Sequence, residues 1–393
     1  MALRYMEIRN RIAAQIDDGT LGTGAQLDPE TRLAEVYEVS RPTVRQALDL
    51  LERDGYITRT QGRGTFVSER VDAGPAVATR LIGFIAPSLA RPFAGQLLAG
   101  AESALTTGGW SLSVSATGDS VAREAELVEQ ALRSGSRGLI IQPTSSRYYN
   151  PVLVRLVADR FPIVMVARHY EHVNTAYVEG DNHSGAMQAV GYLTSRGHAS
   201  IAVISKPFGI KSSMRQRMRG YQEALGHAGL PYRPELVFTD LSDPRSVYSS
   251  AFDESIRESV VAQIEGFLRA QSSVTAVLAF NDLIANDTAI AARRTGRDPQ
   301  RDFAIIGFDD VDVGLPREDL AGSVHVPVHE IGRTGAVALL NRLEEPAADP
   351  AQVLLPTTLI VREDRGDGRV PTQENSRPDG DPDGSPRNPK GGV

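Results

Sequence analysis

The stretch SRPTVRQALDLL, residues 40–51, carries the pattern that decides the fold of the first part of this chain. Ser40 begins the stretch and is a good N-cap, and Gly55 follows it where a helix would stop. Between them, apolar side chains recur at spacings of three and four, which is one face of a helix. These apolar residues are Val44, Ala47, Leu48 and Leu51. The sequence therefore predicts a short helix with well-marked ends.

The polar face of this predicted helix is basic near its N-terminus. Arg41 and Arg45 lie close to the positive end of the helix dipole, where a cation is unfavourable by ~0.3–1 kcal/mol. A docked anion such as DNA phosphate would reverse that sign, and Arg, Thr and Gln side chains also reach base edges in the major groove. The pattern favours a helix that contacts DNA; the alternative from this stretch alone is an ordinary surface helix.

The residues upstream predict two further helices. Apolar side chains at helical spacing run from Tyr5 to Ile16, and Asp28 is expected to cap a second helix that begins at Pro29. Residues 38–40 alone separate that helix from the third one, which is the spacing of a helix-turn-helix.

A basic hairpin is predicted directly after the third helix. Residues 56–60 and 65–67 are β-prone runs, and the Gln-Gly-Arg-Gly of residues 61–64 is a glycine-rich link that carries one cation. Three helices followed by such a hairpin make a winged helix.

Residues 5–67 resemble the GntR family of bacterial regulators through VSRPTVRQALDLLERDGYITRTQGRGTFV, residues 39–67. The resemblance implies that the third helix contacts phosphates and bases in the major groove, while the wing lies along the minor groove. The predicted DNA-contacting residues are Ser40, Arg41, Thr43, Arg45 and Gln46 on the helix and Gly62, Arg63 and Gly64 on the wing.

Length and composition bound the class of protein. A chain of 393 residues has room for two or three domains, and 41% hydrophobic with 23% charged residues is typical of a globular protein. Cysteine is absent, which excludes disulfides and thiolate chemistry. The N-terminal residues are amphipathic and charged rather than signal-like, and no apolar run is long enough to span a bilayer. We therefore expect a cytoplasmic protein without membrane contact.

The net charge of −7 does not exclude DNA binding, because the charges beside the phosphates decide counterion release. Residues 40–67 hold five Arg against three acidic residues, a local charge of +2. Because this patch is modest, we expect a homodimer that binds two half-sites of double-stranded operator DNA.

From Leu81 onward, short apolar runs alternate with helical stretches, which predicts parallel sheets covered by helices on both faces. A break near residues 179–181 divides the eight predicted strands into four and four, so we predict two doubly wound lobes with a ligand cleft at the carboxyl ends of the strands. The predicted strands are residues 81–86, 110–115, 138–142, 162–167, 201–205, 235–239, 276–280 and 303–308. The predicted helices are residues 93–105, 122–134, 151–159, 185–195, 214–225, 255–271 and 283–295.

Residues 81–364 resemble the ligand-binding core of the LacI family, which shares its fold with periplasmic sugar-binding proteins. The resemblance implies a two-lobed domain that binds a sugar or a related small-molecule effector. The predicted fold class is thus an α+β winged helix-turn-helix head joined to an α/β two-lobed periplasmic-binding-protein-like domain. Motifs that carry the resemblance include PFAGQLLAGAESAL at 92–105, RMRGYQEAL at 217–225, LAFNDLIA at 278–285, IIGFDD at 305–310 and LPTTLIVRED at 355–364.

These patterns divide the chain into four predicted parts. The last 28 residues, 366–393, contain six Gly and five Pro. They can bury too little apolar surface to offset the entropy lost on ordering, so we expect this tail to be disordered. The parts are a head at residues 1–68, a linker at 69–80, a LacI-type effector-binding domain at 81–365 with crossovers near 180, 325 and 355, and a tail at 366–393.

A polyhydroxylated ligand needs planar charged groups that each hold two hydroxyls, together with an apolar wall. By resemblance, Arg217 of an Arg-x-x-Gly motif and Asp282 of an Asn-Asp pair contact the effector, and Arg168 follows a strand where the LacI family has another ligand contact. Phe93 would supply the wall, and Lys206 follows a strand that ends at the cleft. Plainer alternatives are a surface arginine for Arg217, a helix cap for Asp282 and core packing for Phe93.

The motifs of several enzyme classes are missing. The sequence has no Gly-x-Ser-x-Gly elbow, no cysteine nucleophile and no Gly-x4-Gly-Lys phosphate loop. His325 and His329 are four residues apart, but Pro327 prevents a helix from presenting both to a metal. We therefore predict no enzyme activity, no cofactor and no metal site.

The sequence as a whole predicts a transcriptional repressor that leaves its operator when a sugar or related metabolite fills the cleft. One alternative is a regulator in which the ligand acts as corepressor, and a binding titration with and without ligand separates the two. Another is a solute-binding protein whose head only dimerises, which a gel-shift with the upstream DNA would test.

Overall fold

The computed structural model describes residues 4–53, 55–60, 63–68, 80–90, 92–144, 148–207, 212–242, 254–312 and 318–362. Gly62, the predicted linker up to residue 79 and the predicted tail lie outside the described residues. Among the helices of the described ranges, none has the length and apolar character needed to cross a membrane.

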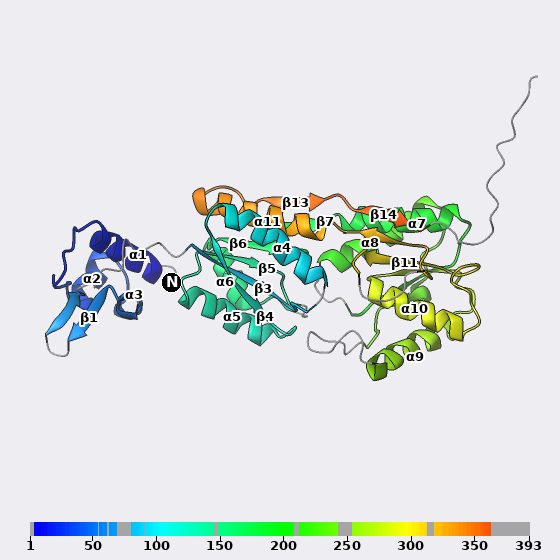
Figure 1. The fold of residues 1–393 in the computed structure, drawn as a ribbon, viewed down its shortest axis with the longest axis horizontal. Helices are drawn as coiled ribbons and strands as arrows, with labels where there is room; N and C mark the ends of the chain where they lie inside the picture. Colours follow the sequence, from blue (N-terminus) through cyan, green and yellow to red (C-terminus); the bar gives the residue numbers. More distant parts are fainter. Residues whose placement is uncertain are drawn as a thin grey trace, which may run out of the picture.

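The head is a three-helix unit followed by a hairpin (Figure 1). The apolar stripe predicted for the third helix is confirmed, because Val44, Ala47 and Leu51 are fully buried in the core of the head. The two strands pair antiparallel, with Ile57 opposite Val67. The elements are α1 (Arg4–Asp17), α2 (Glu30–Val36), α3 (Arg41–Arg53), β1 (Ile57–Thr60) and β2 (Gly64–Val67).

The predicted side-chain cap of α2 is wrong. The helix begins at Glu30 after Pro29, and no side chain caps it. The fixed φ of Pro29, −57°, already suits helix entry, and its carbonyl accepts the backbone N–H groups of Arg32 and Leu33. The Asp28 carboxylate is therefore not needed as a cap.

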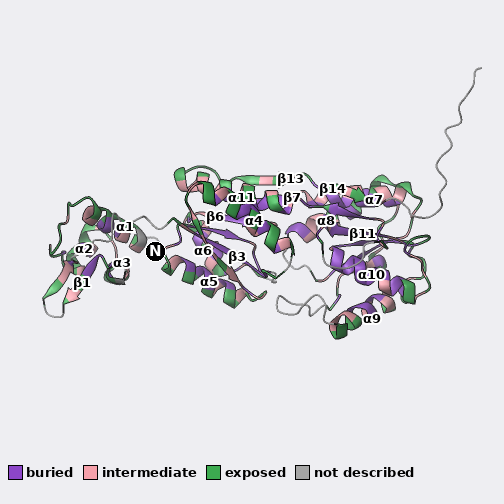
Figure 2. Cartoon of the chain, in the orientation of Figure 1, coloured by how far each residue is buried: buried purple, intermediate pink, exposed green. Residues whose placement is uncertain are grey.

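Two six-stranded sheets form the rest of the described chain (Figure 1). We name the lobe with the sheet order β13-β7-β6-β5-β3-β4 the N-lobe and the lobe with the order β14-β12-β11-β10-β8-β9 the C-lobe. Neighbouring strands are parallel except for β14, which is antiparallel to β12. Helices cover both faces of each sheet, and the central strands are buried (Figure 2), so the predicted α/β architecture is confirmed.

Each lobe is built from two separate stretches of the chain. The N-lobe holds strands β3 (Leu81–Ala86), β4 (Ser111–Ala116), β5 (Gly138–Ile141), β6 (Ile163–Val166), β7 (Ala176–Gly180) and β13 (Gln352–Leu355), and helices α4 (Pro92–Thr107), α5 (Val121–Arg133), α6 (Pro151–Ala158) and α11 (Val328–Glu344). The C-lobe holds strands β8 (Ile201–Ile204), β9 (Val237–Phe238), β10 (Ala276–Ala279), β11 (Ala304–Asp309), β12 (Gly322–His325) and β14 (Thr358–Val361), helices α7 (Asn182–Ser195), α8 (Ser212–His227), α9 (Glu254–Ala270) and α10 (Asp282–Arg294), and the 3-10 turn η1 (Pro234–Leu236).

The prediction of four strands in each lobe is wrong, because each sheet has six. The count of eight omitted β7, β12, β13 and β14, which are only four or five residues long and have at most three consecutive apolar residues. It also omitted α11, whose interior glycines, Gly332 and Gly335, weaken the helical signal in the sequence.

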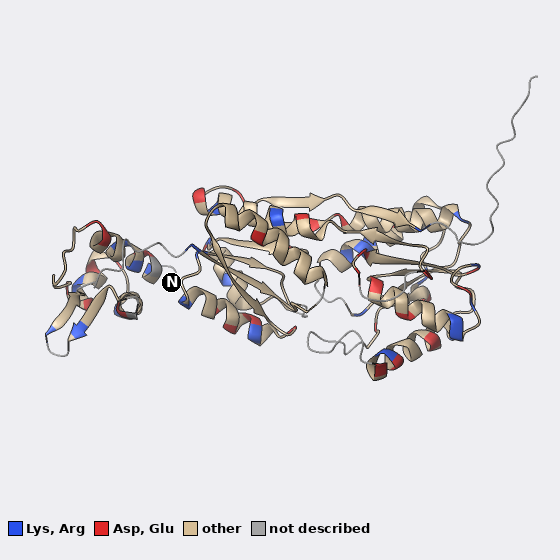
Figure 3. Ribbon diagram, in the orientation of Figure 1, with Lys and Arg blue, Asp and Glu red and all other residues tan. Residues whose placement is uncertain are grey.

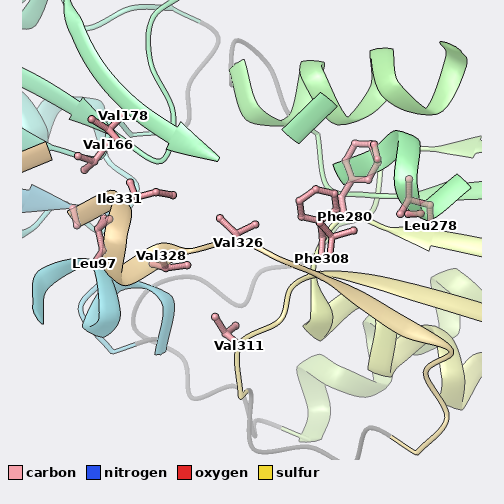
Figure 4. Packing of buried hydrophobic residues seen from close by; sticks show 14 of the residues in the cluster. Leu97, Val166, Val178, Leu278, Phe280, Phe308, Val311, Val326, Val328 and Ile331 are labelled. Atoms are coloured by element: carbon pink, nitrogen blue, oxygen red, sulfur yellow. The ribbon is translucent and has the colours of Figure 1, made fainter. Parts of the chain in front are cut away.

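The chain passes between the lobes three times, after β7, after β12 and after β13. Hydrogen bonds tie two of these crossovers together. Thr357 donates its hydroxyl to the carbonyl of Asp181 at 2.8 Å, and the Gln188 amide bonds the backbone of Thr357 and Leu359 at 3.0 Å each. At the remaining crossover, Val326 lies between the apolar residues of the two lobes (Figure 4). The lobes are thus connected by a narrow, well-packed hinge.

Helices α4 and α11 pack backbone to backbone through two glycines. A Cβ atom added at Gly332 would lie 2.0 Å from the carbonyl oxygen of Leu97, and one added at Gly100 would lie 1.9 Å from that of His329. Only glycine fits at both positions, so the close approach explains why a helix with poor intrinsic propensity forms here.

We expect Gly332→Ala to destabilise the protein by about 3 kcal/mol, because the added methyl group forces the two helix backbones apart. Gly191→Ala in the middle of α7 is the matched control, since a Cβ atom there meets nothing within 4 Å. That control should be neutral or stabilising by up to about 1 kcal/mol. Urea unfolding of both variants measures the difference, and equal stabilities would contradict the packing described for α4 and α11.

Candidate functional site

The predicted DNA-contacting face of α3 is exposed. Arg41, Arg45 and Gln46 are exposed and Thr43 is half-buried, while the apolar stripe faces the core. Ser40 precedes the helix, and its hydroxyl lies 2.8 Å from the Thr43 hydroxyl. The helix therefore presents its cations and hydrogen-bonding groups on one accessible face.

Arg45 is held by an acidic partner from α2. Its Nε and Nη2 atoms donate to both carboxylate oxygens of Glu30, at 3.2 Å and 2.8 Å. This bond lowers the pKa of Glu30 below its ordinary value, with burial opposing it. Basic and acidic residues lie side by side on the head (Figure 3), and without DNA the carboxylate of Glu30 occupies the donors that a phosphate or a base would use.

The described part of the wing is positioned by Gln26. The Gln26 amide donates to the carbonyl of Arg63 at 3.1 Å, and the side chain of Arg63 is exposed. Gly64 has φ +123°, and an added Cβ atom would lie 2.4 Å from the Gln26 amide nitrogen. Only glycine fits this position without strain, so the wing depends on Gly64. Gly62, the other predicted glycine, lies outside the described residues.

The carboxyl edge of the C-lobe sheet is built around Arg217 of α8, which is 5% exposed. Its Nε donates to the Asn182 side chain at 2.8 Å, and its Nη2 donates to Asp309 at 2.9 Å. Its Nη1 donates to the carbonyl of Phe280, and the guanidinium stacks 3.6 Å from the ring centroid of Phe308. Burial lowers the pKa of Arg217, and the Asp309 carboxylate opposes that shift. Arg217 is thus a rigid cation with fixed partners rather than a surface arginine.

Asp282 lies in the same network, but it does not cap α10. The cap is Asn281, which accepts a backbone N–H at 2.8 Å. The Asp282 carboxylate is 1% exposed and accepts the Ser323 hydroxyl at 2.5 Å and the backbone N–H of Val311 at 3.1 Å. Asp282 also acts electrostatically on Arg217. The alternative of a helix cap is therefore wrong for Asp282.

The carboxyl edge of the N-lobe sheet holds a second arginine. Arg168 follows β6, and its Nε donates to the carbonyl of Pro143 at 2.6 Å. Burial lowers the pKa of Arg168, and nearby Glu124 opposes the shift. Glu124 is fully buried and accepts the backbone N–H of Thr144 at 2.6 Å and the Asn150 amide at 3.0 Å. Each lobe thus places one arginine with acidic neighbours at the end of its sheet.

The two remaining predicted effector residues lie on separate elements. Phe93 is in the first turn of α4, partly buried against the main core, which is the packing role considered as its alternative. Lys206 is half-buried after the end of β8. The structure therefore joins Arg217 and Asp282 in one network and distributes Arg168, Phe93 and Lys206 over elements that follow other strands.

Two residues of these networks are not evident from the sequence as site residues. In the sequence, Asp309 is only one of two adjacent acidic residues, yet it accepts a hydrogen bond from Arg217 and has φ +95°, a backbone conformation that is rare for a residue other than glycine. Glu124 has a detectable signal, since it lies on the apolar stripe of α5 with Leu127 and Val128 and is a charged residue at a core position.

With this geometry established, two family models match the chain. Residues 4–67 match the bacterial regulatory proteins of the gntR family, and residues 190–363 match the periplasmic binding protein-like domain. The chain joins a GntR-type head to a periplasmic binding protein-like core. It is a DNA-binding transcriptional regulator, and both predicted resemblances are confirmed.

Two regulators are similar to most of the chain. An arabinose metabolism transcriptional repressor of Geobacillus stearothermophilus is 28% identical and covers 91% of this chain and 96% of its own length. The regulator CelR of Thermobifida fusca is 28% identical over 84% of this chain and 90% of its own length. These relatives are regulators, which confirms the prediction that this chain is not an enzyme.

Solved structures confirm the fold. A CelR–cellobiose complex is 24% identical, covers 86% of this chain and all of its own length, and superposes with a TM-score of 0.62. A LacI-type putative regulator from Bacillus cereus subsp. cytotoxis is 25% identical, covers 73% of this chain and 98% of its own length, and also has a TM-score of 0.62.

We expect Glu30→Gln in the GntR-type head to tighten operator binding about threefold. In the variant, Arg45 no longer has to break an ion pair with a carboxylate before it contacts DNA. Fluorescence anisotropy with a labelled operator duplex at fixed salt measures the change. The control is Glu330→Gln, which breaks an exposed pair with Arg333 within α11 and should leave the affinity unchanged. Weaker binding by Glu30→Gln would show instead that Glu30 positions Arg45 for DNA.

Proposed function

We propose that this regulator is a cytoplasmic homodimeric repressor that binds operator DNA through α3 and the wing and is released when an uncharged sugar fills the cleft between the lobes. The DNA-binding residues are those of the exposed face of α3, with Arg45 as the principal contact. The sugar class is supported by the relatives, one of which is named for arabinose and another for ribose.

The carboxylates around the two arginines are the reason for proposing an uncharged ligand. Arginine at the end of a strand could hold a phosphate or a carboxylate, but both arginines are already compensated by acidic side chains. Five carboxylates act on these two arginines, so an anionic ligand would add repulsion, while hydroxyl groups could both donate and accept. The carboxylates that act on Arg168 are those of Asp119 and Glu124, and those that act on Arg217 are Asp309, Asp282 and Glu179.

Lobe closure supplies the link between the cleft and the DNA. A sugar that bonds Arg217 in the C-lobe and Arg168 in the N-lobe binds the closed form more tightly than the open form, so it shifts the population toward closure. The head precedes β3 and is therefore joined in sequence to the N-lobe. In a homodimer, rotation of the N-lobes changes the spacing of the two heads and prevents both from engaging half-sites one or more helical turns apart.

We expect Arg45→Ala to weaken binding to the DNA upstream of the regulator's own gene at least tenfold, because each head of the variant makes one charge-assisted hydrogen bond fewer to the duplex. The slope of log affinity against log salt should become less steep by about one for each phosphate that the variant no longer neutralises. Anisotropy titrations at several salt concentrations measure both quantities. Undiminished affinity would remove α3 from the DNA interface.

We expect L-arabinose, D-ribose or cellobiose to release the wild-type protein from this operator, and D-ribose 5-phosphate to have no effect at the same concentration, because five carboxylates act on the two arginines. The measurement is operator occupancy during titration with each sugar. Release by the phosphorylated sugar alone would contradict the charge argument, and tighter operator binding with sugar would make the ligand a corepressor.

A further inference from the structure

The first turn of α8 reaches from the C-lobe to a buried carboxylate of the N-lobe. Glu179, near the end of β7, is fully buried. Its carboxylate accepts the Ser212 hydroxyl at 3.0 Å and the Gln216 amide at 2.7 Å, and both donors belong to α8. His169 of the N-lobe adds a bond from its backbone N–H to the Ser212 oxygen at 2.9 Å. We call these four residues the α8 junction.

A carboxylate suits the centre of the α8 junction better than an amide would. The hydroxyl and the amide donate to different oxygens of Glu179, and the Nδ1 atom of His169 lies 3.2 Å from the same oxygen that Gln216 contacts. The two carboxylate oxygens thus accept the Ser212 hydroxyl and the Gln216 amide separately, whereas an amide side chain has a single acceptor oxygen. A buried carboxylate without hydrogen-bond donors would cost free energy. Glu179 therefore favours the lobe arrangement in which α8 keeps Ser212 and Gln216 beside it.

The N-lobe side of the junction is held rigidly. The His169 ring stacks on the Tyr177 ring of β7, with centroids 3.8 Å apart and planes 7° from parallel. Two residues further along the same loop, Glu171 pairs with Arg215 of α8 at 3.1 Å. The loop after β6 and the first turn of α8 are therefore joined at two places.

The N-terminal part of α8 also carries the arginine of the proposed effector site. Arg217 directly follows Gln216, and its three hydrogen bonds hold it to groups of the C-lobe. On the N-lobe side, Arg168 directly precedes His169. Both proposed effector arginines are thus next in sequence to residues of the α8 junction, so a backbone shift at either arginine acts directly on a neighbour in the junction.

We propose that Glu179, with its donors Ser212 and Gln216, sets the angle between the lobes and couples that angle to occupancy of the cleft. Glu179 acts here as a positioning residue without contacting the effector. The coupling to effector rests on the function proposed above, whereas the control of the lobe angle does not. The head precedes β3 and is therefore joined to the N-lobe. The junction thus controls how strongly effector binding at Arg217 changes the position of the DNA-binding head.

The lobe angle can be measured in the full-length protein without any ligand. The chain has no cysteine, so Gln130→Cys in α5 and Ala262→Cys in α9 introduce the only labelling sites. Both positions are exposed, and they lie on helices of different lobes (Figure 1). Distances between spin labels at these sites should be narrowly distributed in the parent protein. Glu179→Gln should broaden and lengthen them, whereas Glu330→Gln, which removes a carboxylate from a pair within α11, should not.

The coupling is tested by sugar titration of the operator complex, with the sugar that releases the parent protein. We expect Glu179→Gln to need about tenfold more sugar for half release, because without the charged acceptor the α8 junction transmits less of the effect of sugar binding at Arg217 to the N-lobe. Ser212→Ala should give a similar shift, and the double variant should be no worse than the stronger single variant, since both remove the same interaction. Operator affinity without sugar should stay within twofold, which a general loss of folding would not allow.

Gln216→Ala serves as a second probe if Glu179→Gln lowers the melting temperature, because Gln216 is only partly buried. It should broaden the spin-label distances and raise the sugar requirement in the same direction. Unchanged distances in both Glu179→Gln and Gln216→Ala would overturn the proposal. If instead no sugar releases the parent protein, the proposed effector response fails, while the distance measurements still decide whether the junction sets the lobe angle.

Discussion

A guanidinium buried at the end of a parallel sheet must have its donors satisfied by fixed acceptors, and this constraint organises the C-lobe. Arg217 meets it with the side chains of Asn182 and Asp309 and the carbonyl of Phe280. These partners come from three different elements or their ends, so one buried cation contacts the start of α7 and the ends of β10 and β11 at the same edge. Any ligand bound there meets groups that are already oriented, which lowers the cost of binding.

In the head, too, an arginine is paired with an acceptor, but the pair is at the surface and loses less hydration. Arg45 and Glu30 form a pair at the surface, where water screens the interaction and exchange with a phosphate is easy. Arg217 is buried among its partners, whereas Arg45 is exposed, so in the proposed function DNA can displace Glu30 from it. Burial thus separates a structural ion pair from an exchangeable one, although the residue types are the same.

Much of the fold could be predicted from the sequence, because local patterns decide it. The stripe of α3 and the continuous apolar runs of β3, β10 and β11 are visible as periodicity alone. The segments that were missed depend on distant partners: β13 is a four-residue edge strand, and α11 forms because Gly100 and Gly332 let two backbones meet. Among the site residues, Arg217 and Asp282 came from a motif, but the roles of Asp309 and Glu179 depend on positions in space that no spacing rule encodes.

The triple crossing of the chain also has a consequence for biosynthesis. The N-lobe begins at β3 but is completed only by α11 and β13, after the intervening C-lobe strands β8 to β12. In the complete protein, α11 covers the apolar face of β5, β6 and β7. During translation this face therefore stays exposed until more than a hundred further residues have been synthesised. The half-made lobe is a natural client for chaperones at that stage, and a truncation before Val328 would leave both lobes unfinished, since β14 of the C-lobe is synthesised later still.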